Sequence, residues 1–498
     1  MDFASALNME SRKTFTENGA TAYNTSGDGL LDFFASAGSL RESDVMRKET
    51  LFEEAFKVDP LLATKALFYV RDIRGGLGER QTFRELIKYI ADKHPEAIIP
   101  NIPLIGEYGR YDDLYALTGT SVESIMWDYI KNQLAEDEEN MKQGKSVSLL
   151  AKWLKTADAS SEMTRKMGIA TALCLGMTVR EYKKKIKALR KYLDIVERKM
   201  SANEWNKIDY STVPSKAMTN YRTAFYNHDS VGFNDYLNKV SKGEAKINSS
   251  TLFPYDILEK YRWFGPWGGH RTIKEDSVLE AQWKALPDYV GEEANAMVIA
   301  DTSGSMVGRP INSAVALAIY FAERNKGAFH NLWMSFSMDS RVQRLKGDTL
   351  AQKLVSIDTD YWGGNTNLEM ALMHILNIAV ENEVKPEEMV KSLIIISDME
   401  IDCCTSANWS FYDEMKSRYE SCGYEIPNIV FWNVNSRHDI FHADKDRKGV
   451  QLCSGQSAST FKTLMSSVGL TPTEMMMKVL NSERYEPIRI LTKVQSIF

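Results

Sequence analysis

The stretch Ala296-Met-Val-Ile-Ala-Asp-Thr-Ser-Gly-Ser-Met306 decides the fold of the C-terminal part of the chain. It opens with an apolar run too short for a helix and ends in side chains that carry oxygen. Similar apolar runs, separated by segments of helical periodicity such as 312–324 and 368–381, follow at Leu332–Phe336, Leu393–Ile396 and Ile429–Val434. Apolar strands that alternate with helices predict a parallel sheet covered on both faces.

Oxygen-bearing side chains follow the predicted strands. Asp301, Ser303 and Ser305 come directly after the first strand, and Asp398 follows the strand at 393–396. Thr366 lies between them in the turn Gly363-Gly-Asn-Thr-Asn. Ligands of an open parallel sheet bind beyond the carboxyl ends of its strands, so these side chains are expected to meet. Two carboxylates and three hydroxyls suit Mg²⁺ or another hard divalent cation, whereas an isolated DxSxS is as often a turn or a cap.

The first 290 residues have a helical pattern. Residues 61–70 are nearly all apolar or helix-forming, and an amphipathic stripe begins at Phe83. Another stripe, from Tyr182 to Met200, predicts one helix of five turns. No alternating strand pattern is evident, so an all-α region of stacked helix pairs is expected at 1–290, followed by an α/β, doubly wound domain at 291–498.

The composition fits a globular protein that stays in the cytoplasm. Hydrophobic residues make up 44% and charged residues 26% of the 498 residues. No apolar run reaches the length of a membrane span, and the N-terminus lacks the layout of a secretory signal. The five cysteines lack the spacing of a zinc site, and their odd number argues against a disulfide framework. We therefore expect reduced thiols and no contact with a membrane.

The net charge of −6 hides a basic segment. Between Ala151 and Arg222 the chain carries 16 Lys or Arg against seven Asp or Glu. One side of a predicted helix gathers a basic group that could contact phosphates, made of Lys183, Lys184, Lys187, Arg190 and Lys191. The alternative is that this charge run is only a solvated helix face.

The segment Arg71-Asp-Ile-Arg-Gly-Gly-Leu-Gly-Glu-Arg80 also allows two interpretations. Its glycines could expose backbone N–H groups to an anion, with Arg71, Arg74 and Arg80 as clamps. Alternatively the glycines only permit a turn between helices, and the arginines pair with Asp72 and Glu79. Similarly, the aromatic run at 261–267 could stack unpaired bases or could serve as core packing.

The C-terminal donor set closely resembles the metal-ion-dependent adhesion site of von Willebrand factor A (vWA) domains. The DxSxS pattern matches Asp301, Ser303 and Ser305, and the family's second and third loops match Thr366 and Asp398. One departure is Met399, where many such domains have Gly, and Glu400 and Asp402 add carboxylates nearby. The resemblance implies that the cation keeps one open coordination position, which an acidic group of a partner protein can fill.

The whole chain resembles an uncharacterised family related to the Ro-type (TROVE) RNA-binding proteins. The motifs that carry the resemblance are residues 18–33 (NGATAYNTSGDGLLDF), 71–80 (RDIRGGLGER), 205–216 (WNKIDYSTVPSK) and 301–305 (DTSGS). The resemblance implies a HEAT-like helical-repeat domain, ring-shaped in the Ro proteins, closed by a vWA domain. It also implies binding of small structured or defective RNA in a ribonucleoprotein, without chemistry of its own.

Three functions follow from these observations. We expect an RNA-binding scaffold first, and second a protein-interaction module in which the cation accepts a carboxylate from a partner protein. A metal-dependent hydrolase comes third. Only one cation is expected, and the sequence shows no nucleophile paired with a base, which argues against hydrolysis. We therefore expect no enzymatic activity.

Overall fold

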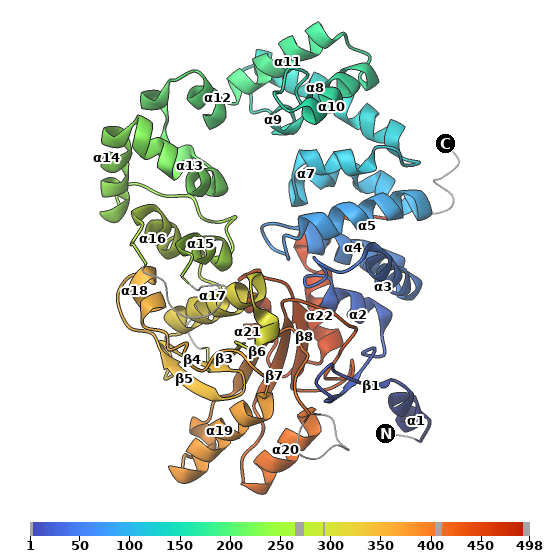
Figure 1. The fold of residues 1–498 in the computed structure, drawn as a ribbon. Helices are drawn as coiled ribbons and strands as arrows, with labels where there is room; N and C mark the ends of the chain where they lie inside the picture. The colour runs from blue at the N-terminus through green and yellow to red at the C-terminus, as the bar shows by residue number, and fades with distance from the viewer. Residues whose placement is uncertain (1–2, 264–272, 292–293, 404–410, 492–498) are drawn as a thin grey trace.

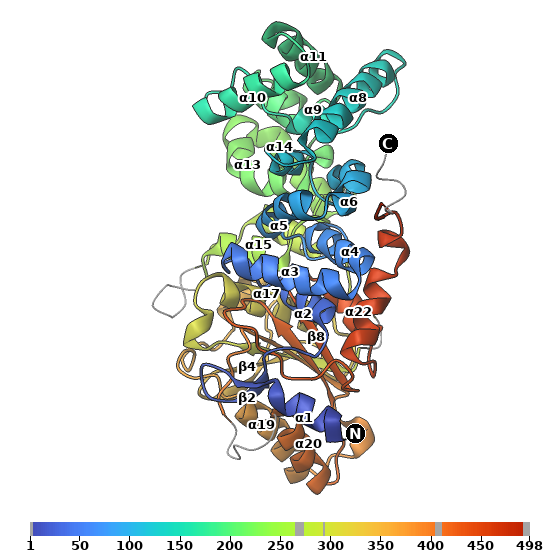
Figure 2. The ribbon, with the colours of Figure 1, turned by 90° about the vertical axis from the view of Figure 1, so that its right-hand side faces the viewer.

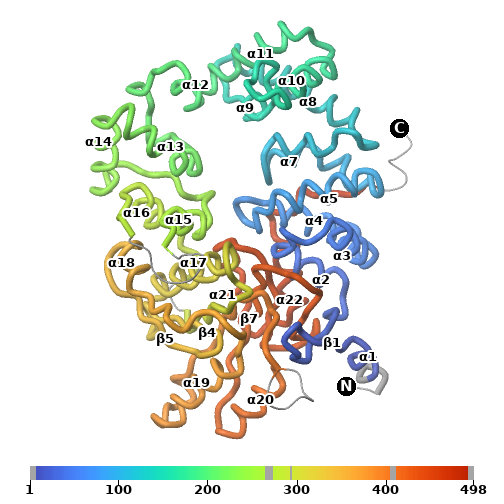
Figure 3. The backbone as a smooth tube through the Cα atoms, viewed as in Figure 1, coloured from blue at the N-terminus to red at the C-terminus, as the bar shows by residue number. Residues whose placement is uncertain are grey.

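The computed structural model describes residues 3–263, 273–291, 294–403 and 411–491. A helical N-terminal region is followed by a domain built on a six-stranded sheet. The helices form an arc that leaves the sheet domain on one side and returns to it on the other (Figures 1 and 3). The first and the last helices of the arc therefore both rest on the C-terminal domain.

The first arm of the arc begins with one helix and a short hairpin and continues in helices. Its elements are α1 (Phe3–Ser11), β1 (Lys13–Phe15), β2 (Thr21–Tyr23), α2 (Gly29–Ser36), α3 (Val45–Val58), α4 (Pro60–Arg71), α5 (Arg80–Lys93), α6 (Pro95–Ile98), η1 (Ile99–Leu104), α7 (Ile105–Tyr108), η2 (Tyr111–Leu117), α8 (Glu123–Lys142), α9 (Leu150–Trp153), α10 (Glu162–Cys174) and α11 (Val179–Tyr192). Side-chain caps start several of them: Asp28 begins α2, and Thr178 with Glu181 forms a capping box on α11.

The second arm returns to the sheet domain and has its own apolar core. Its elements are α12 (Val196–Ser201), η3 (Trp205–Lys207), η4 (Tyr210–Thr212), α13 (Ser215–His228), α14 (Ser230–Ser241), α15 (Pro254–Tyr261) and α16 (Ser277–Lys284). The buried side chains of α13 and α14 cluster around Phe225 and Phe233, whereas those of α15 and most of those of α16 belong to the core that the first arm shares with the sheet.

The C-terminal domain is a mixed sheet between helices. Its elements are β3 (Ala296–Asp301), η5 (Gly304–Met306), α17 (Arg309–Arg324), β4 (Leu332–Phe336), β5 (Ser340–Arg344), α18 (Leu350–Val355), α19 (Leu368–Glu381), η6 (Pro386–Glu388), β6 (Ser392–Ser397), α20 (Phe411–Ser421), β7 (Asn428–Asn433), β8 (Val450–Ser454), α21 (Thr460–Met465), α22 (Pro472–Leu480) and η7 (Glu483–Tyr485). The strand order is β5-β4-β3-β6-β7-β8, and only β5 runs antiparallel. Helices α17 and α21 cover one face, and α19 and α20 cover the other (Figure 1).

One seam joins the start of the arc to the sheet domain. Tyr23 of β2 exchanges backbone hydrogen bonds with Phe441, each at 2.9 Å. Helix α2 packs on β8, where a side chain at Gly38 would meet the backbone of Gly455 at 2.7 Å. Helix α22 runs beside α2 and α4, as Figure 2 shows. The first arm and the sheet therefore share one apolar core.

A second seam joins the end of the arc to the same domain. Helix α15 packs on α17, and α16 packs on α18. The buried carboxylate of Glu280 accepts hydrogen bonds from the backbone N–H groups of Leu350 and Ala351, at 2.7 and 3.0 Å. Glu280 thus supplies acceptors for the first turn of α18, so the second arm is fixed to the sheet domain.

The structure confirms the strands that the apolar runs predict. The predicted positions agree, apart from residues at the element ends, with strands β3, β4, β6 and β7 and with helices α17 and α19. Two strands are missed: β5, which is largely polar because it lies at the sheet edge, and β8, which contains Gln451 and Ser454. The prediction of an all-α region at 1–290 is wrong at its start, where the β1–β2 hairpin lies.

The long helix predicted from Tyr182 to Met200 is also wrong. The chain forms α11, breaks at Asp194 with a φ of +48°, and continues as α12. A residue in the left-handed conformation ends an α-helix. The apolar spacing nevertheless continues beyond the break, because Val196 of α12 is buried in the core of the second arm. None of the helices in the described residues is both long and apolar enough to cross a membrane.

Candidate metal centre

The predicted ligands lie at the carboxyl ends of β3 and β6. These two strands pair in parallel, and the strand order reverses at β3, which makes this point the topological switch of the sheet. Asp301 is the last residue of β3, and Asp398 directly follows β6. The side chains of both aspartates are buried.

The two buried carboxylates influence each other. Burial raises the pKa of Asp301 above its ordinary value, and the negative charge of Asp398 raises that pKa further. The Asp301 carboxylate accepts hydrogen bonds from the Ser303 N–H at 2.8 Å and from the Ser397 hydroxyl at 2.6 Å. Two buried like charges repel, so a cation between them would stabilise the ionised pair.

The three loops at this edge are joined by hydrogen bonds. Gly304 donates to the carbonyl of Gly364 at 3.2 Å, and the backbones of Thr366 and Asp402 are linked at 2.9 Å. The Ser397 bond to Asp301 completes the set. The tertiary structure thus brings together the loops that carry all five predicted ligands.

Each hydroxyl of the predicted set lies in one of these loops. The Ser303 and Ser305 Oγ atoms are 3.2 Å apart, Ser303 is buried and Ser305 is exposed. Thr366 is buried just after Gly363 and Gly364, whose φ values of +100° and +78° require glycine. This turn therefore depends on the Gly-Gly pair of the motif.

The donor set fits a hard divalent cation. Within the described residues there is no group of three or more His, Cys, Asp or Glu side chains that could hold a metal ion. The predicted set differs from such a group because hydroxyls supply three of its five donors. Carboxylates and hydroxyls without imidazole or thiolate match the oxygen preference of Mg²⁺, which also retains water ligands.

Two residues beside this set, Arg437 and Glu17, were not singled out from the sequence. The Arg437 guanidinium donates to Asp398 at 3.0 Å and contacts the Glu17 carboxylate at 2.6 Å. Glu400 is buried, and its carboxylate pairs with His438 at 2.9 Å. Nothing in the local sequence pairs Glu17 with residues about four hundred positions away, although Glu17 directly precedes the motif that begins at Asn18.

Met399, the residue at which the sequence departs from the pattern of many vWA domains, has an unusual backbone conformation. Met399 has a φ of +69°, a left-handed conformation that favours glycine. Its side chain is buried, and its carbonyl accepts a hydrogen bond from His442 at 2.9 Å. Burial of the side chain and hydrogen bonds at both its carbonyl and its N–H, the latter to the Ser397 hydroxyl at 3.0 Å, hold Met399 in this conformation.

The basic group on α11 divides into two parts. Lys184, Lys187 and Lys191 are exposed on one face, and none has an ion-pair partner among the described residues. Lys183 is half-exposed and pairs with Asp158 at 3.2 Å. Arg190 does not join the row, because its guanidinium donates to carbonyls at the end of α9, including Ala151 at 2.8 Å. Arg190 therefore links α11 to α9 and does not face solvent.

The 71–80 segment is a turn whose glycine N–H groups are largely used inside the protein. Gly76 and Gly78 donate to the carbonyl of Asp72, at 3.2 and 3.1 Å. Their hydrogen bonds leave little of the predicted anion nest, so the turn interpretation fits better.

The arginines of this segment pair differently from both interpretations. Arg71 is buried against Asp113 at 2.7 Å, and Arg74 is exposed and donates to the carbonyl of Glu107. Asp72 and Glu79 instead pair with Arg484 and Arg41. Of the predicted clamps, Arg71 is therefore a core residue.

Arg80 belongs to a different cluster, at the N-terminus of α5. Partial burial and then the positive charges of Arg110 and Arg84 lower the pKa of Arg80. Arg84 and Arg110 both contact Asp112, whereas Arg80 has no ion pair among the described residues. The Arg110 guanidinium also lies 4.0 Å from the ring centroid of Trp153. The cluster thus combines an unpaired cation with an aromatic ring.

Arg80, Arg84, Arg110 and Trp153 form what we call the Arg80 cluster, and packing contacts link its elements to α11. Helix α5 packs on η2, η2 packs on α9, and α9 packs on α11. The aromatic run at 261–267 shows no comparable exposure where it is described: Trp263 is buried, and residues 264–267 lie outside the described residues.

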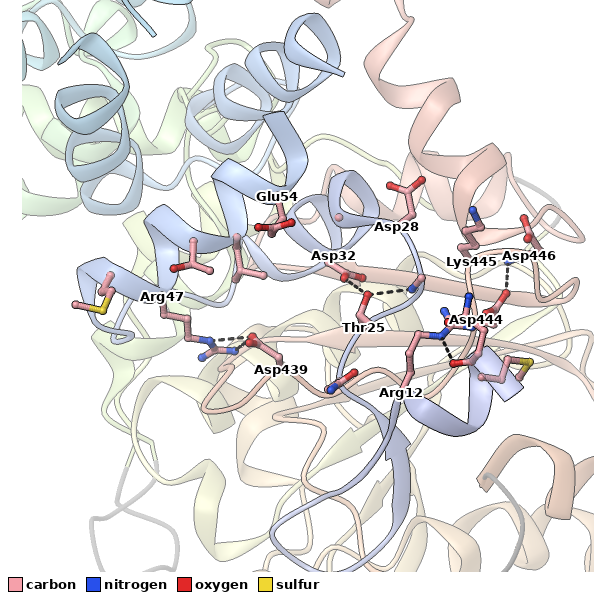
Figure 4. Close-up of a pocket in the computed structure, with 18 of the residues that line it drawn as sticks. Arg12, Thr25, Asp28, Asp32, Arg47, Glu54, Asp439, Asp444, Lys445 and Asp446 are labelled. Atoms are coloured by element: carbon pink, nitrogen blue, oxygen red, sulfur yellow. Dashed lines mark hydrogen bonds and ion pairs between the residues drawn. The ribbon is translucent and has the colours of Figure 1, made fainter. Parts of the chain in front are cut away.

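A cleft of about 1090 Å³ lies between α1, α2, α3 and the loop 439–446. Figure 4 shows ion pairs across it: Arg12 contacts Asp444 at 2.8 Å, and Arg47 contacts Asp439 at 2.7 Å. Burial raises the pKa of Asp32, which accepts hydrogen bonds from the side chain of Thr25 and from the backbone of Ser26. These pairs strengthen the first seam, and we assign no ligand to the cleft.

Two family models match the chain. The model described as Domain of unknown function (DUF2828) matches residues 16–117 and 142–295, and the model described as Domain of unknown function (DUF7788) matches residues 295–494. An uncharacterised protein of Acanthamoeba polyphaga mimivirus is 28% identical over 528 residues, which cover 97% of this chain and 90% of the viral protein. The similarity to the viral protein therefore includes both parts of the molecule.

Proposed function

The chain belongs to the family described as Domain of unknown function (DUF2828), and from its own surface we propose that it is an RNA-binding scaffold similar to the Ro-type proteins. The observation that carries the proposal is the lysine row on α11. Lys184, Lys187 and Lys191 stand at positions i, i+3 and i+7, so they share one helix face, and none is neutralised by an acidic neighbour in the described residues.

A row of this kind suits the phosphates of RNA. Three exposed lysines along two turns of a helix can each neutralise one phosphate and release counterions. Lysines contact the backbone and not the base edges, so the row would select a shape in preference to a sequence. We accordingly propose structured RNA as the ligand of this face.

The Arg80 cluster supports contact with unpaired nucleotides as well. Arg80 offers a guanidinium without a partner among the described residues, and the centroid of the half-buried Trp153 ring lies 4.0 Å from the guanidinium of Arg110 in the same cluster. Stacking on an aromatic ring together with a nearby cation is a common way to hold a single strand. The helix contacts that join this cluster to α11 place both features on neighbouring elements.

The finer architecture belongs to the same proposal. We propose that the arc is a ring of HEAT-like helical repeats and that the α/β domain is of the vWA type. The two seams support the ring, because both ends of the arc rest on one domain. The strand order, with β3 at the switch point and Asp301 at its end, supports the vWA assignment.

The proposed cation is Mg²⁺ or another hard divalent ion, held by Asp301, Ser303, Ser305, Thr366 and Asp398. When bound, it would neutralise the buried aspartate pair and join the three loops. The proposal assigns no chemical reaction to the site and places the protein in the cytoplasm. A protein partner that donates a carboxylate to the cation is less well supported, because Glu17 and Arg437 already lie beside Asp398.

The test is to crosslink RNA to the native full-length protein and to sequence what is recovered. We expect crosslinks at α11 and at the Arg80 cluster, and copurified RNA that is lost as the salt concentration rises. Protein that is free of nucleic acid when purified at low salt, and that binds no structured RNA, would contradict the proposal.

A further inference from the structure

One guanidinium bridges two carboxylates at the candidate metal centre. Arg437 contacts Asp398 through Nη2 at 3.0 Å and Glu17 through Nη1 at 2.6 Å. The Asp398 side chain is fully buried, whereas the side chains of Glu17 and Arg437 are 41% and 37% exposed. The bridge thus lies at the solvent boundary of the buried aspartate pair.

Glu17 is held beside the site by its backbone. Its N–H donates to the Glu400 carboxylate at 2.7 Å, and the Asn18 side chain donates to the Glu400 carbonyl at 2.7 Å. On either side of them, the Thr16 hydroxyl donates to Ile401 at 2.7 Å, and Gly19 forms a bridge with Asp402. These contacts do not involve the Glu17 carboxylate, which instead contacts two half-exposed side chains, Arg437 at 2.6 Å and His438 at 3.6 Å. The carboxylate can therefore change partner while the backbone of the residue stays in place.

We propose that Glu17 fills the open coordination position of the cation in cis and that Arg437 occupies the place of the cation in its absence. The inference rests on the proposed cation site. A guanidinium and a dication cannot share the same carboxylates without strong repulsion, so cation binding displaces Arg437 toward solvent. The Glu17 carboxylate then moves toward the ion and joins Asp301 and Asp398 as a third carboxylate, a grouping that the described side chains do not form in their present positions.

This arrangement gives the cation a structural task. Glu17 lies in the hairpin that precedes the helical arc, whereas Asp301 and Asp398 belong to the sheet domain. A cation held by both parts fastens the first seam at this point. An acidic partner protein would find the open position already taken by a carboxylate of the same chain.

The experiment measures cation affinity in the full-length protein. Mg²⁺ binding is followed by titration calorimetry and Mn²⁺ binding by electron paramagnetic resonance, for the wild type and for Glu17→Gln and Arg437→Gln. Glu10→Gln and Arg447→Gln are the matched controls, since Glu10 pairs only with exposed Lys13 and Arg447 pairs with Asp413. Thermal unfolding without metal verifies that each variant is folded.

We expect Glu17→Gln to weaken cation binding by about tenfold or more, because one charged ligand is lost. Arg437→Gln should strengthen binding by about tenfold, because the competing positive charge is removed. Glu17→Asp, which keeps the charge but shortens the side chain, should fall between the wild type and Glu17→Gln. Mg²⁺ should also slow hydrogen exchange in residues 13–23 of the wild type.

Different results overturn different parts of the argument. If the wild type binds neither Mg²⁺ nor Mn²⁺, the cation site itself is wrong, and the inference falls with it. If the wild type binds the cation and Glu17→Gln has the same cation affinity as Glu10→Gln, the cation site is supported, but Glu17 is not one of its ligands. Arg437→Gln that binds no more tightly than Arg447→Gln would overturn the displacement of Arg437.

Discussion

Replacing Lys184, Lys187 and Lys191 together by Ala should remove most of the salt sensitivity of RNA binding. Each lysine is exposed and is free of an ion pair among the described residues, so each can neutralise one phosphate. One phosphate contact contributes about 0.7–0.9 to the slope of log K against log salt, so three contacts contribute about 2–3. At 0.15 M salt this corresponds to binding about 100-fold weaker than the wild type, if both proteins bind equally at 1 M.

The assay is fluorescence anisotropy with a labelled stem-loop RNA at several salt concentrations. The matched control replaces three exposed lysines of the second arm, Lys242, Lys246 and Lys260, and changes the net charge by the same amount. We expect the control to keep a slope close to that of the wild type. The role of the α11 lysine row in RNA binding would be refuted in either of two cases: the triple α11 variant keeps the wild-type slope, or the control variant loses as much of the slope as the triple α11 variant.

Three further predictions concern the folded state. Glu280→Ala should lower the free energy of unfolding by about 2–4 kcal/mol in urea titrations, because two buried N–H groups at the start of α18 lose their acceptor; an unchanged midpoint would show that the second seam does not depend on it. Burial lowers the pKa of His442 to about 4, so the unfolded chain binds more protons below the ordinary pKa of 6.5 and stability falls as the pH drops from there toward 4. Between pH 7.5 and pH 5 this loss should be about 2 kcal/mol in the wild type and absent in His442→Gln, and equal pH dependence of the two proteins would contradict it. Asp301→Asn should raise the thermal stability of the metal-free protein at pH 8, because burial and the charge of Asp398 both oppose a negative charge on Asp301. The same variant should no longer be stabilised by Mg²⁺. Stabilisation by Mg²⁺ that survives in this variant would exclude Asp301 as a ligand.

Several features of the fold could be predicted from the sequence because they depend on neighbours in the chain. The buried strands β3, β6 and β7 are continuous apolar runs, and such runs have few alternatives to a covered parallel sheet. Asp301 and Asp398 follow two of these strands directly. Once the strands are parallel, geometry alone places their carboxyl ends at one edge.

Other features were not accessible from local patterns. The sequence of α11 shows a basic face, but it does not show that Arg190 turns toward α9 while Lys187 faces solvent. In the same way, the 71–80 segment shows arginines and glycines without revealing that Arg71 is buried against Asp113. A charged side chain takes the partner that the packed helices bring to it, and the packing is set by the whole arm.

The sequence by itself determined the covered sheet, the helical character of most of the first 290 residues and the edge at which the candidate ligands meet. Only the tertiary structure decided that the hairpin around Glu17 lies on that edge and that Arg437 joins Glu17 to Asp398. The reason is physical: these contacts link residues from opposite ends of the chain. They form only when the start of the chain packs on the sheet domain, and no local propensity encodes that contact.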